Sequence, residues 1–310
     1  GGGDDPVQAV DELGWLKLAG EERIAIIAQR HTSEIPGSSI FDGSPFDTMS
    51  DVLPQMVRYM LETYPALDPS RVYVSGYSMG GSCTNRAVYG DASVFAAAVN
   101  MSGTPYTHTE GQDEQFKPLD IPMMLTTCTY DTYTHFDAEN GIIAEDFQMN
   151  INDYLTYNEM DTVTFDFETY PMSGFKGDVY RETMVNDEYP LYSWFFLNDE
   201  GAPMVGLSII EFIPHGLYQE YANIAWDYMK HFSRDPETLE IAYCPYLSFP
   251  GVPGTDGAGH VHSPFETLNK YLRRLSHETL FGRAAVPDDN ARVSGGTGRG
   301  NFPLQPVPEQ

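Results

Sequence analysis

A short turn sequence between an apolar strand and an apolar helix constrains this chain more than any other feature. Residues 76–81 read Gly-Tyr-Ser-Met-Gly-Gly and directly follow residues 71–75, Arg-Val-Tyr-Val-Ser. The pattern predicts a strand, a sharp turn at Ser78 and then a helix over 79–89. Glycines on both sides of the serine let neighbouring backbone approach where a Cβ atom would clash. Such a turn lifts a serine hydroxyl clear of the end of a sheet, where it can act as a nucleophile.

The rest of the chain alternates strand-length apolar runs with longer segments of helical spacing. This alternation predicts an α/β fold with a mostly parallel central sheet flanked by helices. Strands are expected at 23–28, 71–75, 94–99, 121–126 and 204–213, and helices at 7–19, 48–64, 79–89, 142–158 and 218–232. Residues 162–196 are rich in aromatic side chains and alternate as β-hairpins do, which predicts an insertion over about 137–196.

The composition changes after residue 236. Residues 1–236 are therefore expected to form the catalytic domain, and residues 237–310 a C-terminal extension. That extension carries one helical pattern at 264–281, followed by a Gly-, Pro- and Asn-rich stretch that is expected to be a mobile tail.

The chain is strongly acidic, with 45 Asp and Glu against 17 Lys and Arg and a formal net charge of -28. This charge repels phosphate backbones, so nucleic acid is not an expected partner. It also disfavours anionic membrane surfaces, and no apolar run reaches the 18 residues that a membrane span needs.

The three cysteines show no metal-ligand spacing. Cys83 and Cys128 lie in apolar segments and are expected to be buried as small hydrophobic residues, whereas a disulfide through Cys244 stays open. His260 and His262 have a spacing that could suit a metal, but no third ligand is evident. We therefore expect no metal and no organic cofactor.

A nucleophilic serine needs a base, and the base needs an acid that orients it. When the serine lies on a strand-to-helix turn, the chain order is serine, acid, histidine, with each residue following a later strand. Asp131 follows the strand at 121–126 and is the expected acid; Asp137 is the rival but lies further from the strand end.

His215 is the expected base, because it follows the strand at 204–213 and precedes the helix at 218–232. His231 lies within a helical run, and His135 is too close to Asp131 in the sequence to come from a separate strand end. Ser78, Asp131 and His215 are thus the candidate catalytic residues.

An oxyanion hole needs two hydrogen-bond donors. The first is expected to be the backbone N–H of Met79, the residue after the nucleophile. The second normally comes from a glycine-rich loop after an early strand. The chain begins Gly1-Gly2-Gly3, and Gly2 is the candidate donor, which would mean that the chain begins inside this loop and lacks the first strands. The alternative is that these glycines are an added linker.

Two aromatic residues are the expected substrate contacts. Tyr77 precedes the nucleophile, and Trp194 belongs to the aromatic insertion between acid and base. One interpretation of this insertion is a lid or wall for a bulky acyl group; the other is ordinary hairpin packing, which favours aromatic side chains anyway.

The chain resembles the polyhydroxybutyrate depolymerase and feruloyl-esterase group of α/β-hydrolases over roughly residues 1–236. The matching landmarks are the Gly-Gly-Gly-Asp-Asp start, Gly14-Trp15, residues 68–81, Phe95 to Val99 with Met101-Ser-Gly103, Ile121-Pro with Asp131, and Trp226 with Phe232 to Asp235. The resemblance implies the α/β-hydrolase fold, ester hydrolysis by Ser78, His215 and Asp131, and a secreted protein. Asp131 follows Thr127-Cys128-Thr129, where the group commonly has a His-Gly pair.

The expected function is that of a serine carboxylic-ester hydrolase acting through an acyl-enzyme. Its substrate would be a small-molecule or polymeric ester, such as a phenolic (feruloyl-type) or hydroxyalkanoate ester. The alternatives are a serine peptidase of the prolyl-oligopeptidase kind, although no propeller repeats are visible, and a catalytically inactive hydrolase-like binding protein.

Overall fold

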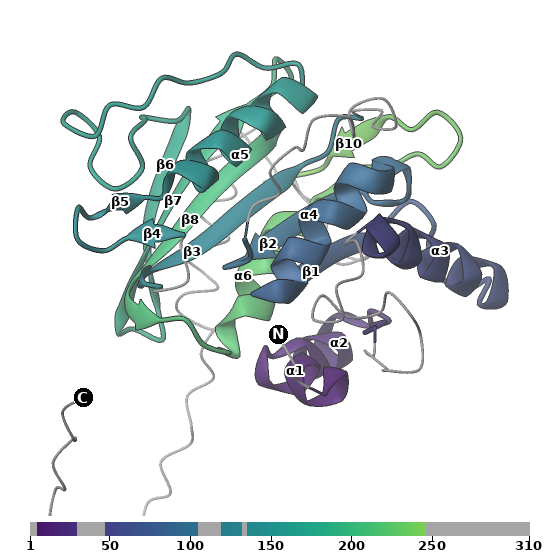
Figure 1. The fold of residues 1–310 in the computed structure, drawn as a ribbon. Coiled ribbons are helices and arrows are strands. Elements are labelled where there is room, and N and C mark those ends of the chain that lie inside the picture. Colours follow the sequence, from purple (N-terminus) through teal and green to yellow (C-terminus); the bar gives the residue numbers. More distant parts are fainter. Residues whose placement is uncertain (1–4, 30–46, 105–118, 132–134, 246–310) are drawn as a thin grey trace, which may run out of the picture.

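The computed structural model describes residues 5–29, 47–104, 119–131 and 135–245, and its centre is one six-stranded sheet (Figure 1). The strand order is β1-β2-β3-β8-β7-β6. The bounds of these strands are β1 Tyr73–Tyr77, β2 Ala97–Met101, β3 Met123–Tyr130, β8 Pro203–Pro214, β7 Tyr189–Leu197 and β6 Val179–Val185. β1, β2, β3 and β8 pair in parallel, whereas β7 and β6 continue the sheet as an antiparallel hairpin. The expected mostly parallel sheet is confirmed.

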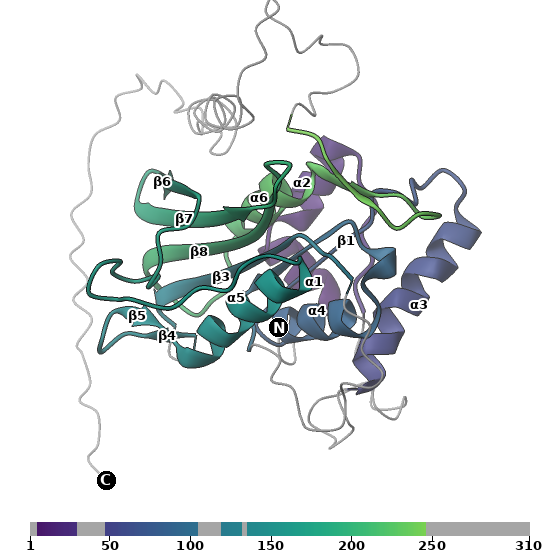
Figure 2. The ribbon, with the colours of Figure 1, turned by 90° about the horizontal axis from the view of Figure 1, so that it is seen from above.

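Helices cover both faces of the sheet. The helices are α1 Pro6–Glu12, α2 Trp15–Glu22, α3 Asp47–Thr63, α4 Met79–Asp91, α5 Glu145–Tyr157 and α6 Glu220–Met229. Figure 2 shows α4 and α5 on one side of the sheet, with α6 and α2 on the other. Among the described residues, none of these helices is both long and apolar enough to cross a lipid bilayer.

The single helix predicted at 7–19 is two helices, α1 and α2. Gly14 separates them with a φ of 83°, a left-handed conformation that glycine adopts without strain. A Cβ atom on Gly14 would lie 2.1 Å from the backbone oxygen of Gln219. The break therefore lets the N-terminal segment pack closely against the residue that precedes α6.

The strand predicted at 23–28 is wrong. Residues 24–29 have no regular secondary structure, and Ile27 is 39% exposed. Ile24 packs instead against the small cluster of Leu18, Ala222 and Trp226. Within the part of the chain that the structure describes, β1 pairs only with β2, so this apolar segment adds no strand to the other edge of β1. Apolar, β-branched composition suits a strand but does not by itself provide a pairing partner.

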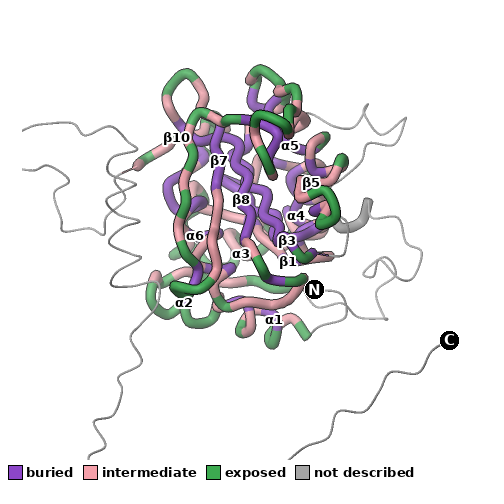
Figure 3. The backbone as a smooth tube through the Cα atoms, turned by 90° about the vertical axis from the view of Figure 1, so that its left-hand side faces the viewer, coloured by how far each residue is buried: buried purple, intermediate pink, exposed green. Residues whose placement is uncertain are grey.

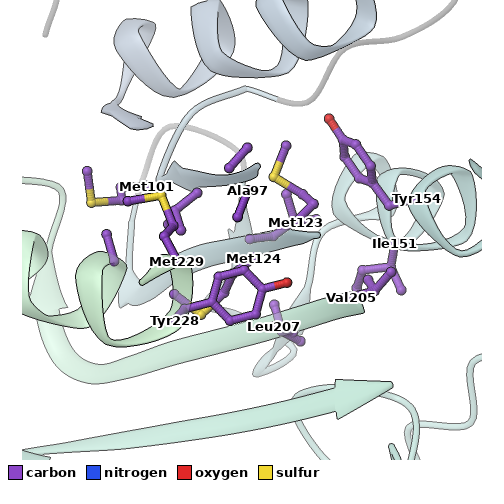
Figure 4. Close-up of a cluster of buried hydrophobic side chains, with 14 of the residues drawn as sticks. Ala97, Met101, Met123, Met124, Ile151, Tyr154, Val205, Leu207, Tyr228 and Met229 are labelled. Atoms are coloured by element: carbon purple, nitrogen blue, oxygen red, sulfur yellow. The ribbon is translucent and has the colours of Figure 1, made fainter. Parts of the chain in front are cut away.

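The core is continuous along the parallel strands and against the helices on both faces. All five residues of β2 are buried, and so are the first seven of β3. Figure 3 shows β3 and β8 within the buried, purple centre of the molecule. Figure 4 shows methionines of β2 and β3 together with Tyr154 from α5 and Tyr228 from α6 in this core. Parallel strands are typically buried on both faces, as these are. The packed helices therefore hold the strands, and with them the loops at the strand ends, in place.

The aromatic insertion extends the sheet rather than forming a separate unit. It begins with a two-stranded ribbon, β4 Phe136–Asp137 with β5 Ile142–Ile143, followed by α5. The hairpin of β6 and β7 then leads into β8. Aromatic rings of this region, such as Phe175 and Phe196 with centroids 4.9 Å apart, pack on one another. For these residues ordinary hairpin packing is the observed role.

The packed domain continues beyond the boundary expected at residue 236. Residues after β9 (Phe232–Arg234) turn back as β10 (Ile241–Tyr243), and the two pair antiparallel. Arg234 is 2% exposed, and its guanidinium donates to the backbone oxygens of Phe95, Asp120 and Leu239. Because these bonds join the hairpin to two sheet loops, the boundary at 236 falls inside a structural unit. The helix and tail expected at 264–310 lie outside the described residues.

Candidate active site

Ser78 lies on a strained turn between β1 and α4. Its φ is 56° and its ψ is -121°, and its N–H donates to the backbone oxygen of Met101 at 2.8 Å. A non-glycine residue adopts a positive φ only where the surrounding structure holds it there. The turn is therefore built into the fold, as the sequence pattern predicted.

Close backbone approaches explain the glycines around Ser78. A Cβ atom on Gly76 would lie 2.2 Å from the backbone oxygen of Gly80, and one on Gly81 would lie 2.8 Å from the Cα of Gly103. Gly80 itself has open space where its Cβ would be. Gly76 and Gly81 are thus required by packing, since both approaches involve backbone atoms that cannot rotate away.

Three side chains meet at this turn. The Nε2 of His215 lies 2.8 Å from the Oγ of Ser78, and its Nδ1 lies 2.8 Å from the Oδ2 of Asp131. The Asp131 side chain is fully buried, whereas that of His215 is 12% exposed. With the Nδ1–H donating to the carboxylate, Nε2 presents its lone pair to the serine hydroxyl, which is the arrangement for removing its proton.

The parallel strands explain why residues so distant in sequence converge. Ser78 follows β1, Asp131 follows β3 and His215 follows β8, so all three stand at the carboxyl ends of parallel strands. Loops at these ends meet along one edge of the sheet. The rival acid Asp137 is not part of the group, because its carboxylate accepts from the side chain of Asn140 in an exposed turn.

Tyr77 reaches the site in a role other than the one predicted. Its side chain is 4% exposed, and its ring lies 4.7 Å from the His215 ring and 5.5 Å from the Tyr221 ring, measured between centroids. The buried ring supports one face of the imidazole. Tyr77 therefore positions the candidate base, and its burial leaves little surface for a substrate.

Trp194 does not reach the site. It lies on β7 beside Leu207 of β8, and Leu207 precedes His215 by eight residues. At about 3.3 Å per strand residue this separation is roughly 25 Å. Trp194 is 7% exposed and packs near the rings of Phe175 and Tyr180. The prediction that it contacts a substrate at Ser78 is wrong, because the hairpin places it far along the sheet.

The candidate oxyanion donors have different outcomes. Met79 is the first residue of α4, and first-turn N–H groups have no acceptor within their own helix. Its own helix thus does not use this N–H, and the positive end of the helix favours negative charge there, so its role as a donor stays a prediction. Gly2 lies outside the described residues.

His135 is a residue near the site that the sequence reasoning set aside. It is 1% exposed and stacks on Phe147, with ring centroids 5.2 Å apart. Burial lowers its pKa to about 4, with opposing effects from the charges of Asp131 and His215. It is thus a neutral imidazole close to the candidate acid. Its position just before the insertion gave no signal in the sequence.

The cysteines have no part in this chemistry. All three are free thiols, with Cys128 buried, Cys83 partly buried and Cys244 exposed. The Sγ of Cys128 lies 3.0 Å from the hydroxyl of Tyr221, and burial raises its pKa to about 11. Such a thiol is rarely ionised and is a poor nucleophile. In the described ranges no cluster of three potential metal ligands occurs, and His260 and His262 fall outside them.

One comparison with known proteins, a match to a family model, spans part of this site. Residues 47–145 match the model of the prolyl oligopeptidase family, a range that contains Ser78 and Asp131. Among solved structures, an acetyl xylan esterase from Aspergillus awamori is similar over 60% of this chain and 70% of that one, with 14% identity and a TM-score of 0.38. No curated protein matches significantly.

The finer resemblance to polyhydroxybutyrate depolymerases and feruloyl esterases stays a prediction. The coarser assignment rests on three independent findings: the mostly parallel sheet with its flanking helices, the strained serine turn, and the family match across that turn. Together they support a serine hydrolase with the α/β-hydrolase fold.

Proposed function

We propose that this protein is a serine carboxylic-ester hydrolase with Ser78 as nucleophile, His215 as base and Asp131 as orienting acid. The observation that carries the proposal is the pair of 2.8 Å contacts that links the three side chains at one strained turn. The distances suit direct proton transfer from the serine hydroxyl to the imidazole.

The reaction follows from these contacts. As the Ser78 Oγ attacks the ester carbonyl carbon, its proton passes to the Nε2 of His215. The carboxylate of Asp131 holds the Nδ1–H tautomer and stabilises the imidazolium. His215 then returns the proton to the departing alcohol, which leaves an acyl group on Ser78. Water, deprotonated by the same imidazole, attacks the acyl carbon and releases the carboxylic acid.

The developing oxyanion needs two donors, and the N–H of Met79 is one of them. The second donor is a backbone N–H of the first glycine-rich loop, for which Gly2 is the candidate. No metal or organic cofactor takes part in this mechanism.

An exposed aromatic pair favours a substrate with an aromatic or bulky group. Tyr130 and Phe212 are 52% and 54% exposed, with ring centroids 6.4 Å apart. Tyr130 adjoins Asp131, and Phe212 lies three residues before His215. Phe212 has a φ of 63°, and its N–H donates to the Thr129 hydroxyl at 2.8 Å, which fixes it at the rim. Exposed rings this close in sequence to the acid and the base suit a phenolic ester better than the distant hairpin aromatics.

The direct test replaces the nucleophile. Ser78→Ala should reduce hydrolysis of a p-nitrophenyl ester by at least about 1,000-fold, whereas Ser82→Ala, one helical turn further on, should keep the activity. A fluorophosphonate probe should label Ser78 and leave the Ser78→Ala protein unlabelled. Retained turnover in Ser78→Ala would refute the assignment, and an inert wild-type protein would favour the binding-protein alternative.

The match to the prolyl oligopeptidase family favours a second candidate, a serine peptidase. Both reactions use the same three side chains, so the leaving group must decide. The assay compares an ester with an anilide that carries the same acyl group. A ratio of kcat/KM values well above 1,000 in favour of the ester supports the esterase; comparable values support the peptidase.

A further inference from the structure

A cavity lies under α6, against the antiparallel part of the sheet, and residues of the candidate triad do not line it. We call it the α6 cavity. Its volume is about 100 Å³. This is several times the roughly 15 Å³ that one buried water needs, which leaves room for a small organic molecule. Met124 and Tyr228, both visible in Figure 4, contribute to its walls.

The floor of the α6 cavity is a row of polar residues across three strands, one arginine and two serines. Arg181 of β6 pairs with Ser193 of β7, which pairs in turn with Ser208 of β8. The two serine hydroxyls lie 2.8 Å apart and satisfy each other. Their small size leaves the space between the sheet and α6 unfilled, and apolar side chains such as Ile224 form much of the remaining wall.

Arg181 brings an unpaired cation into this space. Its Nε and Nη2 atoms are buried and have no hydrogen-bond partner, and its guanidinium carbon lies 5.3 Å from the centroid of the Phe195 ring. Burial lowers its pKa to about 10, so it keeps its charge at neutral pH. Buried donors without partners are rare in folded proteins. Nε and Nη2 are also the two donors that form the side-on fork to a carboxylate.

Two further buried polar atoms line the α6 cavity without a partner, the Nε2 of His231 and the hydroxyl of Tyr243. The Nδ1 of His231 donates to the backbone oxygen of Cys244 at 3.0 Å, which makes Nε2 an acceptor. The Tyr243 hydroxyl can donate. The Tyr243 hydroxyl can therefore donate a further hydrogen bond to an anion that is held by Arg181. The Nε2 of His231 can accept one from a water or a hydroxyl group.

The acidic residues at the cavity have their own partners. Asp227 pairs with the Nζ of Lys230, and Glu220 accepts from the side chain of Asn186. Neither forms an ion pair with Arg181 in the described part of the chain. Asp227 lies close enough for its charge to raise the pKa of Arg181 against the effect of burial, yet it leaves the Nε and Nη2 donors without a hydrogen bond. The unpaired donors in the cavity therefore belong to the cation.

We propose that the α6 cavity binds a small monocarboxylate with a short apolar chain. The carboxylate pairs side-on with the Nε and Nη2 of Arg181 and accepts from the Tyr243 hydroxyl. The apolar chain lies against Ile224 and its neighbours on α6. This site is separate from Ser78, so the ligand binds whether or not the protein hydrolyses esters.

The test measures binding by calorimetry to the full chain carrying Ser78→Ala, which keeps catalysis out of the measurement. Butyrate should bind, and butyramide, which has the same shape without the charge, should bind at least about 10-fold more weakly. Arg181→Gln should weaken butyrate binding at least 10-fold, whereas Arg58→Gln, which removes an exposed arginine that is paired with Asp91, should leave it unchanged.

Two further variants keep the result interpretable if Arg181→Gln fails to fold. Ile224→Phe should block binding by filling the cavity while Arg181 stays in place, and Tyr243→Phe should weaken it several-fold. Circular dichroism checks that each variant is folded. The proposal is overturned if butyrate and butyramide bind equally, if neither binds, or if folded Arg181→Gln and Ile224→Phe proteins bind butyrate like the parent.

Discussion

The two polar regions of this molecule differ in how far their hydrogen bonds are completed. At the edge of the parallel strands, His215 is bonded on both ring nitrogens, to Ser78 and to Asp131. In the α6 cavity, the fork of Arg181, the Nε2 of His231 and the hydroxyl of Tyr243 are buried without partners. The first region is complete before any substrate arrives, and the second is complete only with a ligand.

This difference follows from what each region has to do. A proton relay works only if its geometry is fixed in advance, so its members bond to one another. A binding site must leave its donors for the ligand, and it carries the free-energy cost of unpaired buried groups until the ligand binds. Substitutions in the triad should therefore lower the rate of ester hydrolysis and leave ligand binding in the α6 cavity unchanged.

Replacing the candidate acid should have the largest effect on activity, and this effect should be confined to the triad. Asp131→Asn should lower kcat/KM for a p-nitrophenyl ester by about 10³–10⁴-fold, because the imidazole loses its orienting charge and tautomer. Butyrate binding in the α6 cavity should not change. Asp137→Asn, at the exposed rival acid, serves as the control. If Asp137→Asn lost activity and Asp131→Asn kept it, the acid assignment would be wrong.

Acidification should destabilise the folded protein, and one buried histidine in each region should contribute a similar amount. Burial holds the pKa of His135, beside the triad, and of His231, in the α6 cavity, at about 4. In the unfolded chain each pKa is about 6.5, so between these values the unfolded state binds more protons. Stability is therefore full above pH 6.5 and falls as the pH drops towards 4, by about 2 kcal/mol per histidine at pH 5.

Urea unfolding at pH 7 and pH 5 measures this loss. His135→Gln and His231→Gln should each remove about half of the pH dependence, since an amide does not titrate in this range. An undiminished pH dependence in the double variant would assign the loss to other groups.

Packing should distinguish the tight turn from the open cavity. Gly81→Ala places a methyl group against backbone atoms of Gly103 and should cost about 1–3 kcal/mol. Gly80→Ala, with open space at its Cβ, should be neutral or slightly stabilising in the same helix. Val185→Ile, at the wall of the α6 cavity, should stabilise by about 0.5 kcal/mol or cost nothing. Thermal unfolding gives the order, and equal costs at positions 80 and 81 would contradict it.

Thiol labelling compares the accessibility of the two regions without changing stability or activity. Cys244, which directly follows β10, is exposed and should react first with a disulfide reagent at pH 8. Cys128, beneath the triad, has its pKa raised to about 11 by burial and should react only after denaturation. Mass spectrometry of peptides from native and denatured protein gives the order. Fast native labelling of Cys128 would mean that the region beneath the triad opens readily.

The parallel part of the molecule could be predicted because its signals are local. The turn at Ser78 and the strand ends before Asp131 and His215 are each visible within a short stretch of sequence. The order of the three residues then needs only their positions along the chain. The strand predicted at 23–28 failed for the opposite reason. Its composition suits a strand, but a strand also needs a neighbour, and the neighbour depends on the whole topology.

The role of individual aromatic residues was likewise beyond the sequence. Trp194 and Tyr77 were both expected at the substrate, yet one packs roughly 25 Å away along the sheet and the other supports the imidazole from beneath. The α6 cavity left no pattern at all. Arg181, Ser193 and Ser208 come together only through strand register, which a hydrophobic pattern does not specify for polar residues.

The positive φ of Ser78 has a consequence for how this chain can change over generations. Glycine adopts such a backbone at little cost, while serine loses on the order of 1 kcal/mol. A lineage that no longer needed the hydroxyl would thus gain stability by a single substitution to glycine. Descendants that keep serine here do so although glycine would make the folded state more stable. Their retention of serine would indicate selection for the hydroxyl group.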